Sequence, residues 1–444
     1  MNKSYNISAV SLGCAKNQYD LEASLADLIT EGHQIVYDFC DADIIIINTC
    51  SFIESARQET RENIDEAVEA KKDNPDIKII VCGCYPQKFK DEMLELYGEY
   101  IDAYCGIEMH KYITDIIRQL PNFSGKIEKT GTEWYEPKNG RLNTLGDFTG
   151  NIKISEGCNN RCSYCAIPSI RGTLRSRPEE YILKEAENMS QSGILELNVI
   201  AQDITAYGKD FNKKDALSEL LKKMNDLKGS LQWIRLLYAY PTEITDNLID
   251  TIRNCEKIVK YLDIPLQHGD NSVLGDMNRR GTAEEYLETI QKLRDAVPDI
   301  CLRSTFIVGY PTETDKAFEN LIDFVKKAQF DRAGFFTYSR EINTPAYGID
   351  TSVPENIIAE RAKILGKVLD NISLNKNNQL LNRKLDVLCE DRDDRYIYGR
   401  TYRDAIDIDG YIKIKTKKNL TGKIIKNVTV TKAHIYDLEG KLTD

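Results

Sequence analysis

The sequence predicts an α/β protein in three parts: an N-terminal open parallel sheet, a central partial barrel of six β–α units, and a small C-terminal barrel made only of strands. Apolar segments of strand length alternate with amphipathic helical segments over residues 1–120 and again over 148–375. From residue 376 onward, short strands separated by turns replace this alternation. Residues 121–147, rich in Gly, Asn, Pro and charged side chains, are predicted to form a linker.

The N-terminal region places a cysteine after each of three predicted strands. We expect these strands over residues 7–12, 43–47 and 77–81, with helices over 18–30 and 54–72. The isoleucine run in the second strand is typical of a parallel strand buried on both faces. Cys14, Cys50 and one of Cys82 and Cys84 follow these strands. Because the carboxyl ends of parallel strands meet at one edge of a sheet, three thiols are predicted to converge there. Buried structural cysteines are the alternative, and spacing alone does not choose between Cys82 and Cys84.

The central region is predicted to contain six parallel strands, over residues 152–155, 196–200, 233–237, 261–264, 302–308 and 334–338. Helical patterns separate most of them, over residues 178–190, 216–227, 245–255, 283–296 and 314–328. Successive β–α units of this kind favour an incomplete barrel with its site at the carboxyl ends of the strands. Polar residues follow the second, third and fourth strands: Gln202, Asp203, Tyr238, Tyr240, Gln267 and His268. Each of these, taken alone, fits a structural hydrogen bond better than a catalytic role.

Three cysteines follow the first strand of this region. Cys158, Cys162 and Cys165 lie close together, with Tyr164 just before the last, and the next cysteine is Cys255. Thiolates bind iron–sulfur clusters, and four are needed to saturate a cubane. Three would leave one iron open to a small molecule. A structural zinc site usually takes four protein ligands, and a disulfide would leave one thiol spare. A 4Fe–4S cluster is therefore the better interpretation, and the N-terminal thiols would make a second cluster site that also lacks one ligand.

The C-terminal region is predicted to be a small all-β barrel that follows a charged helix over residues 354–381. Its strands are expected over residues 385–389, 396–400, 411–415 and 428–433. From residue 376 the chain carries fifteen Lys and Arg against eleven Asp and Glu. This mild positive bias would suit contact with RNA, and it would equally suit a solvated surface.

The overall composition bounds the function. The net charge of −11 argues against a protein that coats nucleic acid non-specifically, and it suits a basic protein substrate. We find no apolar run of membrane-spanning length and no signal-peptide pattern at the N-terminus. Twelve cysteines in such a chain favour metal or redox chemistry over a disulfide framework. A cytoplasmic location without a membrane partner is therefore expected.

These motifs resemble those of the radical S-adenosylmethionine (SAM) superfamily and, within it, the methylthiotransferase family. The Cys-x3-Cys-x2-Cys spacing with an aromatic residue before the last cysteine is similar to the superfamily motif. Ser-Leu-Gly-Cys-Ala-Lys-Asn at residues 11–17, Asn-Thr-Cys-Ser-Phe-Ile at 48–53 and Gly83-Cys84 resemble the three auxiliary-cluster motifs of the family, which selects Cys84 over Cys82. The C-terminal region resembles a TRAM domain.

The resemblance implies two 4Fe–4S clusters and SAM as cofactors. One cluster would be held by Cys158, Cys162 and Cys165 and the other by Cys14, Cys50 and Cys84. Tyr164, Gly193 and Glu196 would help to seat SAM. No side chain is assigned as a catalyst, because the clusters and SAM would carry the radical chemistry. SAM would serve both as methyl donor and as radical source.

The resemblance is strongest to the branch that adds a methylthio group to the β-carbon of an aspartate in small-subunit ribosomal protein twelve. Residues 201–208, 238–241 and 261–268 carry this likeness. The partners it implies are that basic protein, a reductant such as flavodoxin or ferredoxin, and RNA contacted through the TRAM-like region. Two alternatives are methylthiotransfer to a modified adenosine of tRNA and a non-catalytic iron–sulfur electron-transfer protein.

Overall fold

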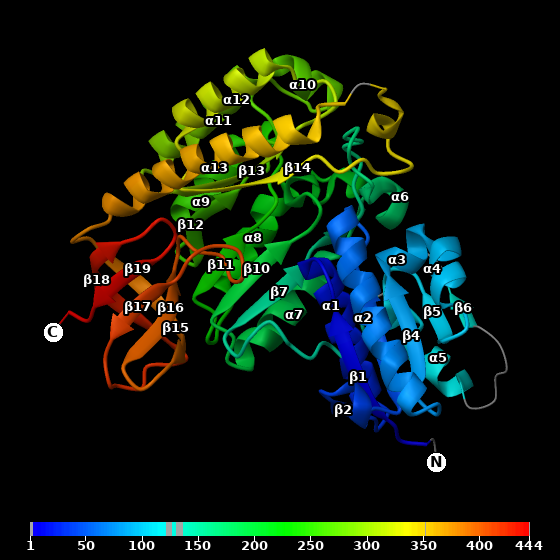
Figure 1. The fold of residues 1–444 in the computed structure, drawn as a ribbon. Coiled ribbons are helices and arrows are strands. Elements are labelled where there is room, and N and C mark those ends of the chain that lie inside the picture. Colours follow the sequence, from blue (N-terminus) through cyan, green and yellow to red (C-terminus); the bar gives the residue numbers. More distant parts are fainter. Residues whose placement is uncertain (1–2, 121–126, 130–135, 351, 444) are drawn as a thin grey trace.

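The computed structural model describes residues 3–120, 127–129, 136–350 and 352–443. Figure 1 shows the three predicted parts, with the central sheet lying between the N-terminal domain (blue and cyan) and the small C-terminal barrel (orange and red). The predicted fold class is confirmed in all three parts.

The N-terminal domain is a parallel sheet with strand order β2-β1-β3-β4-β5-β6. Its strands are β1 (Asn6–Ser11), β2 (Gln34–Val36), β3 (Ile44–Thr49), β4 (Lys78–Gly83), β5 (Ile101–Cys105) and β6 (Ile127–Lys129). Its helices are α1 (Ala15–Thr30), α2 (Glu54–Asp73), α3 (Cys84–Lys88), α4 (Lys90–Tyr97) and α5 (Ile113–Gln119). Ile45 and Ile47 pack into the core on one face of the sheet, and Ile44 and Ile46 into the core on the other. This two-sided burial explains the continuous apolar run of β3.

The central domain is a parallel half-barrel whose strands keep their sequence order, with β7 and β14 at its edges. Its strands are β7 (Thr149–Lys153), β10 (Glu196–Ile200), β11 (Trp233–Leu236), β12 (Ile258–Asp263), β13 (Cys301–Val308) and β14 (Arg332–Thr337). The helices are α7 (Glu179–Gln191), α8 (Ala216–Asp226), α9 (Asp246–Asn254), α11 (Ala283–Ala296), α12 (Asp315–Ala328) and α13 (Glu355–Asn378). Two short helices, α6 (Ile167–Arg171) and α10 (Asn271–Asp276), and the short pair β8 (Ser155–Glu156) and β9 (Arg175–Ser176) lie in its loops. The prediction of six β–α units in a partial barrel is therefore correct.

The C-terminal domain is a closed barrel with strand order β15-β16-β17-β19-β18. Its strands are β15 (Lys384–Arg392), β16 (Tyr396–Thr401), β17 (Ile412–Lys415), β18 (Lys423–Ala433) and β19 (Leu438–Lys441). This barrel packs against the amino ends of the central strands. There Arg332 pairs with Asp404 at 2.6 Å, and the Tyr261 hydroxyl donates to Asp409 at 2.8 Å.

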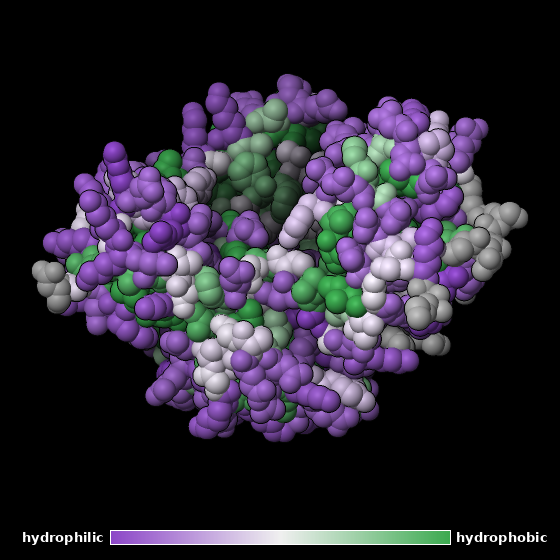
Figure 2. Space-filling model, turned by 90° about the horizontal axis from the view of Figure 1, so that it is seen from below, coloured by the Kyte–Doolittle hydropathy of each residue, from purple (hydrophilic) through white to green (hydrophobic). Residues whose placement is uncertain are grey.

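The N-terminal domain packs at the opposite, carboxyl end of the central strands. Helix α1 contacts β7, and α3 contacts α6. Figure 2 views the molecule from below and shows a hollow between the C-terminal barrel and the N-terminal domain, with apolar residues gathered inside it. Within the described ranges, no helix is both long and apolar enough to cross a lipid bilayer.

Candidate functional site

The loop after β8 holds Cys158, Cys162 and Cys165 at the carboxyl end of the half-barrel. The backbone N–H of Asn160 donates to the Cys158 sulfur at 3.5 Å, and that of Ile167 donates to the Cys165 sulfur at 3.5 Å. A guanidinium N–H of Arg279 lies 3.9 Å from the Cys162 sulfur. The loop therefore presents three sulfurs, each with a donor beside it.

Burial and neighbouring thiols oppose the ionisation of Cys158 and Cys165. Burial, and then the neighbouring Cys162 thiolate, raise the pKa of Cys165 to about 12. Burial also raises the pKa of Cys158, and the nearby Asp203 and Cys162 raise it further. Three thiolates in one buried loop need a strong positive charge among them, and bound iron supplies one. The donor set thus fits an iron–sulfur cluster.

The second group of thiols forms at the carboxyl edge of the N-terminal sheet. Cys14 precedes α1, Cys50 follows β3, and Cys84 begins α3. The Asn17 side chain holds two of these loops together, because its amide donates to the carbonyls of Leu12 at 2.9 Å and Thr49 at 2.8 Å. Gly13, at a φ of +88°, makes the approach possible: a Cβ there would lie 2.6 Å from the Cys50 sulfur.

The three N-terminal thiols differ in their electrostatics. Burial raises the pKa of Cys50 to about 12, with Cys84 and Cys14 adding to the effect. Burial also raises the pKa of Cys84, to about 11, although Arg171 opposes it. At Cys14, Lys16, Arg171 and the N–H groups of the first helical turn outweigh burial and lower the pKa below the usual thiol value. As in the other loop, a metal cluster is the partner that would let all three ionise together.

The structure separates Cys82 from Cys84. Cys82 is fully buried in the apolar core, with its sulfur 3.1 Å from that of Cys105. Gly83 then turns the chain at a φ of +92°, and Cys84 emerges on the other side beside Arg171, whose guanidinium N–H lies 3.8 Å from its sulfur. This arrangement agrees with the choice that the family motifs make.

The two cysteine groups meet across the domain interface. Cys84 packs with Ala166, the residue after Cys165, and with Ile170 of α6. Arg171, fully buried, donates to Glu156 at 2.9 Å and to the side chain of Asn17. One guanidinium therefore joins the central loop to the N-terminal motif.

A buried network of opposite charges supports this contact. The Lys153 ammonium pairs with Asp20 at 2.6 Å and with Glu156 at 2.9 Å, and Gln202 donates to Glu156 at 2.7 Å. The side-chain oxygen of Gln202 is buried without a hydrogen-bond partner in the part of the chain that the structure describes. An unpartnered buried acceptor beside the cysteine loop is a position that a bound polar ligand would satisfy.

The polar residues predicted at the strand ends divide into two kinds. Asp203 accepts from Asn160 of the cysteine loop at 2.8 Å, and Tyr238 adopts a positive φ of 68° at the mouth of the half-barrel. By contrast, His268 pairs with buried Glu313 at 3.0 Å, which is a structural contact. Backbone strain of the kind seen at Tyr238 is common at functional sites.

The predicted SAM contacts lie in two different places. Tyr164 is within the cysteine loop and packs beside Tyr310 and Tyr338. Gly193 and Glu196 lie at the amino end of β10, where Glu196 pairs with Arg235 at 2.7 Å and with Arg400 of the C-terminal barrel. Their position does not support a role in seating SAM, because the carboxylate is already neutralised at the end of the barrel that faces away from the cysteines.

Sequence reasoning missed several residues of this site. Three of them lie within the sequence motifs that resemble those of the family: Lys16, Asn17 and Arg171. Their place in a motif was the feature that could have indicated a role in the site. Lys153 and Asp20 gave no signal, because isolated charges in helices and strands usually face solvent.

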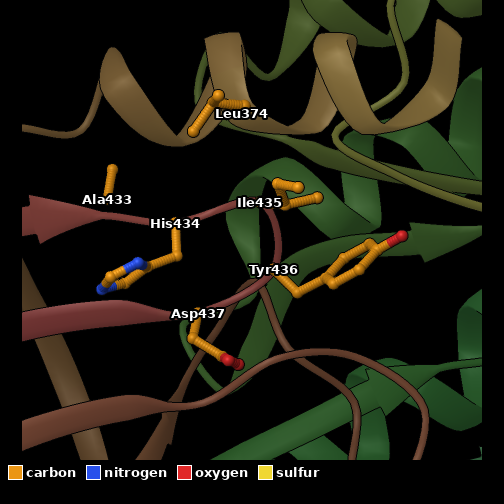
Figure 3. A pocket seen from close by; sticks show the side chains of 6 residues that line it. All are labelled: Leu374, Ala433, His434, Ile435, Tyr436 and Asp437. Carbon is orange, nitrogen blue, oxygen red and sulfur yellow. The ribbon is translucent and has the colours of Figure 1, made fainter. Parts of the chain in front are cut away.

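Among the described residues, no group of three His, Cys, Asp or Glu side chains is placed to hold a single metal ion. A surface pocket between α13 and the β18–β19 connection is lined by Leu374, Ala433, His434, Ile435, Tyr436 and Asp437 (Figure 3). None of these residues belongs to either cysteine loop.

Comparisons with known proteins agree with the fold. Three family models match: an uncharacterized protein family, UPF0004, over residues 6–106, the radical SAM superfamily over 152–325, and the TRAM domain over 383–443. The radical SAM methyltransferase TsrM from Kitasatospora setae aligns with a TM-score of 0.57 at 15% identity, covering 78% of this chain and 74% of that one. The cobalamin-dependent SAM radical enzyme OxsB aligns with a TM-score of 0.55 at 14% identity, covering 82% and 56%. At these identities the likeness shows the fold alone.

The half-barrel with its cysteine loop, together with the matched models, defines a radical SAM protein that carries two further domains. The ribosomal protein uS12 methylthiotransferase RimO of Geobacter sulfurreducens is 40% identical, covering 99% of both chains. That of Thermodesulfovibrio yellowstonii is 42% identical, covering 98% of this chain and 99% of its own. The chain therefore belongs to the RimO family of ribosomal protein uS12 methylthiotransferases.

Proposed function

We propose that this protein is an iron–sulfur- and SAM-dependent enzyme that adds a methylthio group to the β-carbon of an aspartate in ribosomal protein uS12. The observation that carries the proposal is the meeting of two cysteine groups at the mouth of one half-barrel, joined through Arg171. Methylthiotransfer needs both C–H activation and a sulfur source, and two adjacent clusters would supply them.

We assign Cys158, Cys162 and Cys165 to one 4Fe–4S cluster and Cys14, Cys50 and Cys84 to the other. With SAM bound, these cofactors supply the one-electron chemistry that activates a carbon no side-chain base can deprotonate. The residues of the chain hold the reactants close together and keep water out. Lys153 and Arg171 of the central domain both pair with Asp20 of α1, and these buried ion pairs fix the two cysteine groups relative to each other.

The choice of a protein substrate over RNA rests on the family and on charge. The net charge of −11 would attract a basic ribosomal protein and repel an RNA backbone. A mild excess of Lys and Arg in residues 376–444 leaves room for RNA contact through the TRAM domain. The enzyme would work in the cytoplasm with a reductant such as flavodoxin or ferredoxin.

The test is a competition between substrates. The anaerobically reconstituted enzyme, holding about eight irons, is incubated with SAM, sulfide and reductant in the presence of uS12 and tRNA. We expect uS12 to gain one SCH3 in place of H on an aspartate-containing peptide. Methylthio-adenosine in the tRNA digest with an unmodified peptide would contradict the proposal.

Iron content tests the cluster assignment separately. Replacing Cys158, Cys162 and Cys165 by Ala is expected to leave about half of the iron and to abolish reductive cleavage of SAM. Retained cleavage in this triple variant would show that the radical site has been placed on the wrong cysteines.

A further inference from the structure

Lys16 is a buried cation that pairs with no carboxylate among the residues that the structure describes. The residue is only 6% exposed, yet it makes no ion pair and its ammonium donates no hydrogen bond within the part of the chain that the structure describes. Its nitrogen lies 3.6 Å from the centre of the Tyr238 ring. Other buried lysines of the same interface are paired, Lys88 with Glu341 at 3.2 Å and Lys153 with Asp20 at 2.6 Å. Buried lysines are rarely left unpaired, because desolvation of the charge is costly.

The position of Lys16 on its helix adds to the unbalanced charge. It is the second residue of α1, whose first turn holds no acidic residue. The N-terminus of a helix carries partial positive charge and disfavours a cation. Lys16 therefore adds a positive charge where the helix dipole opposes one. The ammonium and the helix N-terminus together favour a bound anion.

A series of contacts connects this positive site with both cysteine groups. Lys16 is two residues beyond Cys14, and Tyr238 stands at the mouth of the half-barrel after β11. Two residues further on, the Tyr240 ring is 4.5 Å from the guanidinium of Arg279, which reaches the Cys162 sulfur at 3.9 Å. A substrate group held by Lys16 would thus lie between the N-terminal cysteines and those of the central loop.

We propose that Lys16 binds the side-chain carboxylate of the target aspartate. This inference rests on the proposed function and extends it to how the substrate is recognised. The β-carbon that would gain the methylthio group is directly bonded to that carboxylate, so an ammonium that fixes the carboxylate also fixes the reacting carbon. A charge-assisted hydrogen bond in a desolvated site supplies both affinity and orientation. Asparagine, of the same size but uncharged, would lose the ionic part of this contact.

A double-mutant cycle tests the assignment by equilibrium binding. Two uS12 peptides, one with the target aspartate and one with asparagine in its place, are titrated against reconstituted wild-type enzyme and against Lys16→Met, which keeps the aliphatic stem. We expect Lys16→Met to weaken binding of the aspartate peptide by about 10- to 100-fold, the range for hydrogen bonds to charged groups, and to change binding of the asparagine peptide by less than about twofold. Lys16→Arg should recover part of the loss, which a purely structural role would not produce. Lys78→Met, at the amino end of β4 and away from the cysteines, is the control and should leave both affinities unchanged.

Two outcomes would overturn the inference. Equal losses for the aspartate and asparagine peptides would show that Lys16 does not contact the carboxylate. Loss of SAM affinity with unchanged peptide affinity would assign the cation to the carboxylate of SAM instead. Failure of the proposed function is a different result, because wild-type enzyme would then leave the aspartate peptide unmodified whatever Lys16 binds.

Discussion

At the scale of single residues, the two cysteines flanking Gly83 should behave differently. Cys84→Ala is expected to lose the N-terminal cluster, about half of the iron, and all methylthiolation, while reductive cleavage of SAM continues. Cys82→Ala should cost only about 1 kcal/mol of stability, because its sulfur contacts Cys105 in the apolar core. Iron analysis and peptide mass spectrometry measure both. Equal loss of methylthiolation in the two variants would contradict the distinction.

The sequence predicted the cysteines at this scale and missed most of what surrounds them. A thiol is rare and chemically specific, so three cysteines after three strands and three more in one loop are visible without a structure. Lys153 and Asp20 are 133 residues apart, and nothing local to either indicates that they form a buried pair. The ion pairs of Glu196 with Arg235 and Arg400 were equally hidden, because a carboxylate at the start of a strand does not reveal which domain will cover it.

At the scale of elements, the β1–α1 turn depends on Gly13. Gly13→Ala should lower the iron content by up to half, because a methyl group would lie 2.5 Å from the Cys50 Cβ and displace that cysteine. The positive φ adds about 1–2 kcal/mol of strain. Gly32→Ala is the matched control: its φ of +92° imposes the same strain, but nothing lies within 4 Å of the added methyl group. If the two variants retain equal iron, close packing against Cys50 is not what the glycine provides.

Predicted elements are correct where the signal is local. Apolar runs predict the strands β1, β3 and β4. The predicted bounds of β3 differ from the observed ones by only one or two residues, because four consecutive isoleucines define the strand. Strands β2 and β6 are three residues long, and β19 pairs in parallel with β17, so long-range pairing defines them more than sequence does. Strand β6 also lies inside the segment predicted as a linker. The domain boundaries at residues 120, 147 and 375 stay predictions.

At the scale of the whole molecule, the order of domains is visible in the sequence and their packing is not. The N-terminal domain covers the carboxyl ends of the central strands, and the C-terminal barrel covers the amino ends (Figure 1). Each interface is made by ion pairs between residues far apart in the chain, such as Arg57 with Glu341 at 2.6 Å. Because only the folded structure brings these charges together, the spacing of residues in the sequence could not predict the ion pairs.

Glu196 joins the central domain to the C-terminal barrel through its ion pair with Arg400, so its substitution tests how much this interface stabilises the protein. Burial would raise the pKa of its carboxyl, but Arg235 and Arg400 outweigh burial and lower the pKa to about 2. A carboxyl whose folded-state pKa lies below its unfolded value stabilises the fold above the unfolded value, and this contribution is lost as the pH falls from about 4.5 to about 2. The shift corresponds to about 3 kcal/mol of stability at neutral pH.

Glu196→Gln should therefore destabilise the protein at neutral pH and remove that part of its acid sensitivity. The substitution leaves buried Arg235 without its carboxylate partner and Arg400 with only Glu390, and breaking a buried ion pair costs about 3–5 kcal/mol. Glu390→Gln is the control, because Glu390 also contacts Arg400, at 2.7 Å, but its side chain is 25% exposed and its loss should cost less than about 1 kcal/mol. Urea unfolding between pH 3 and pH 7 measures both variants, and SAM titration of the folded protein accompanies it. Since Glu196 lies at the end of the strands away from the cysteine loop, SAM affinity should not change. A loss of SAM affinity at unaltered stability would return this residue to the cofactor site that the sequence suggested.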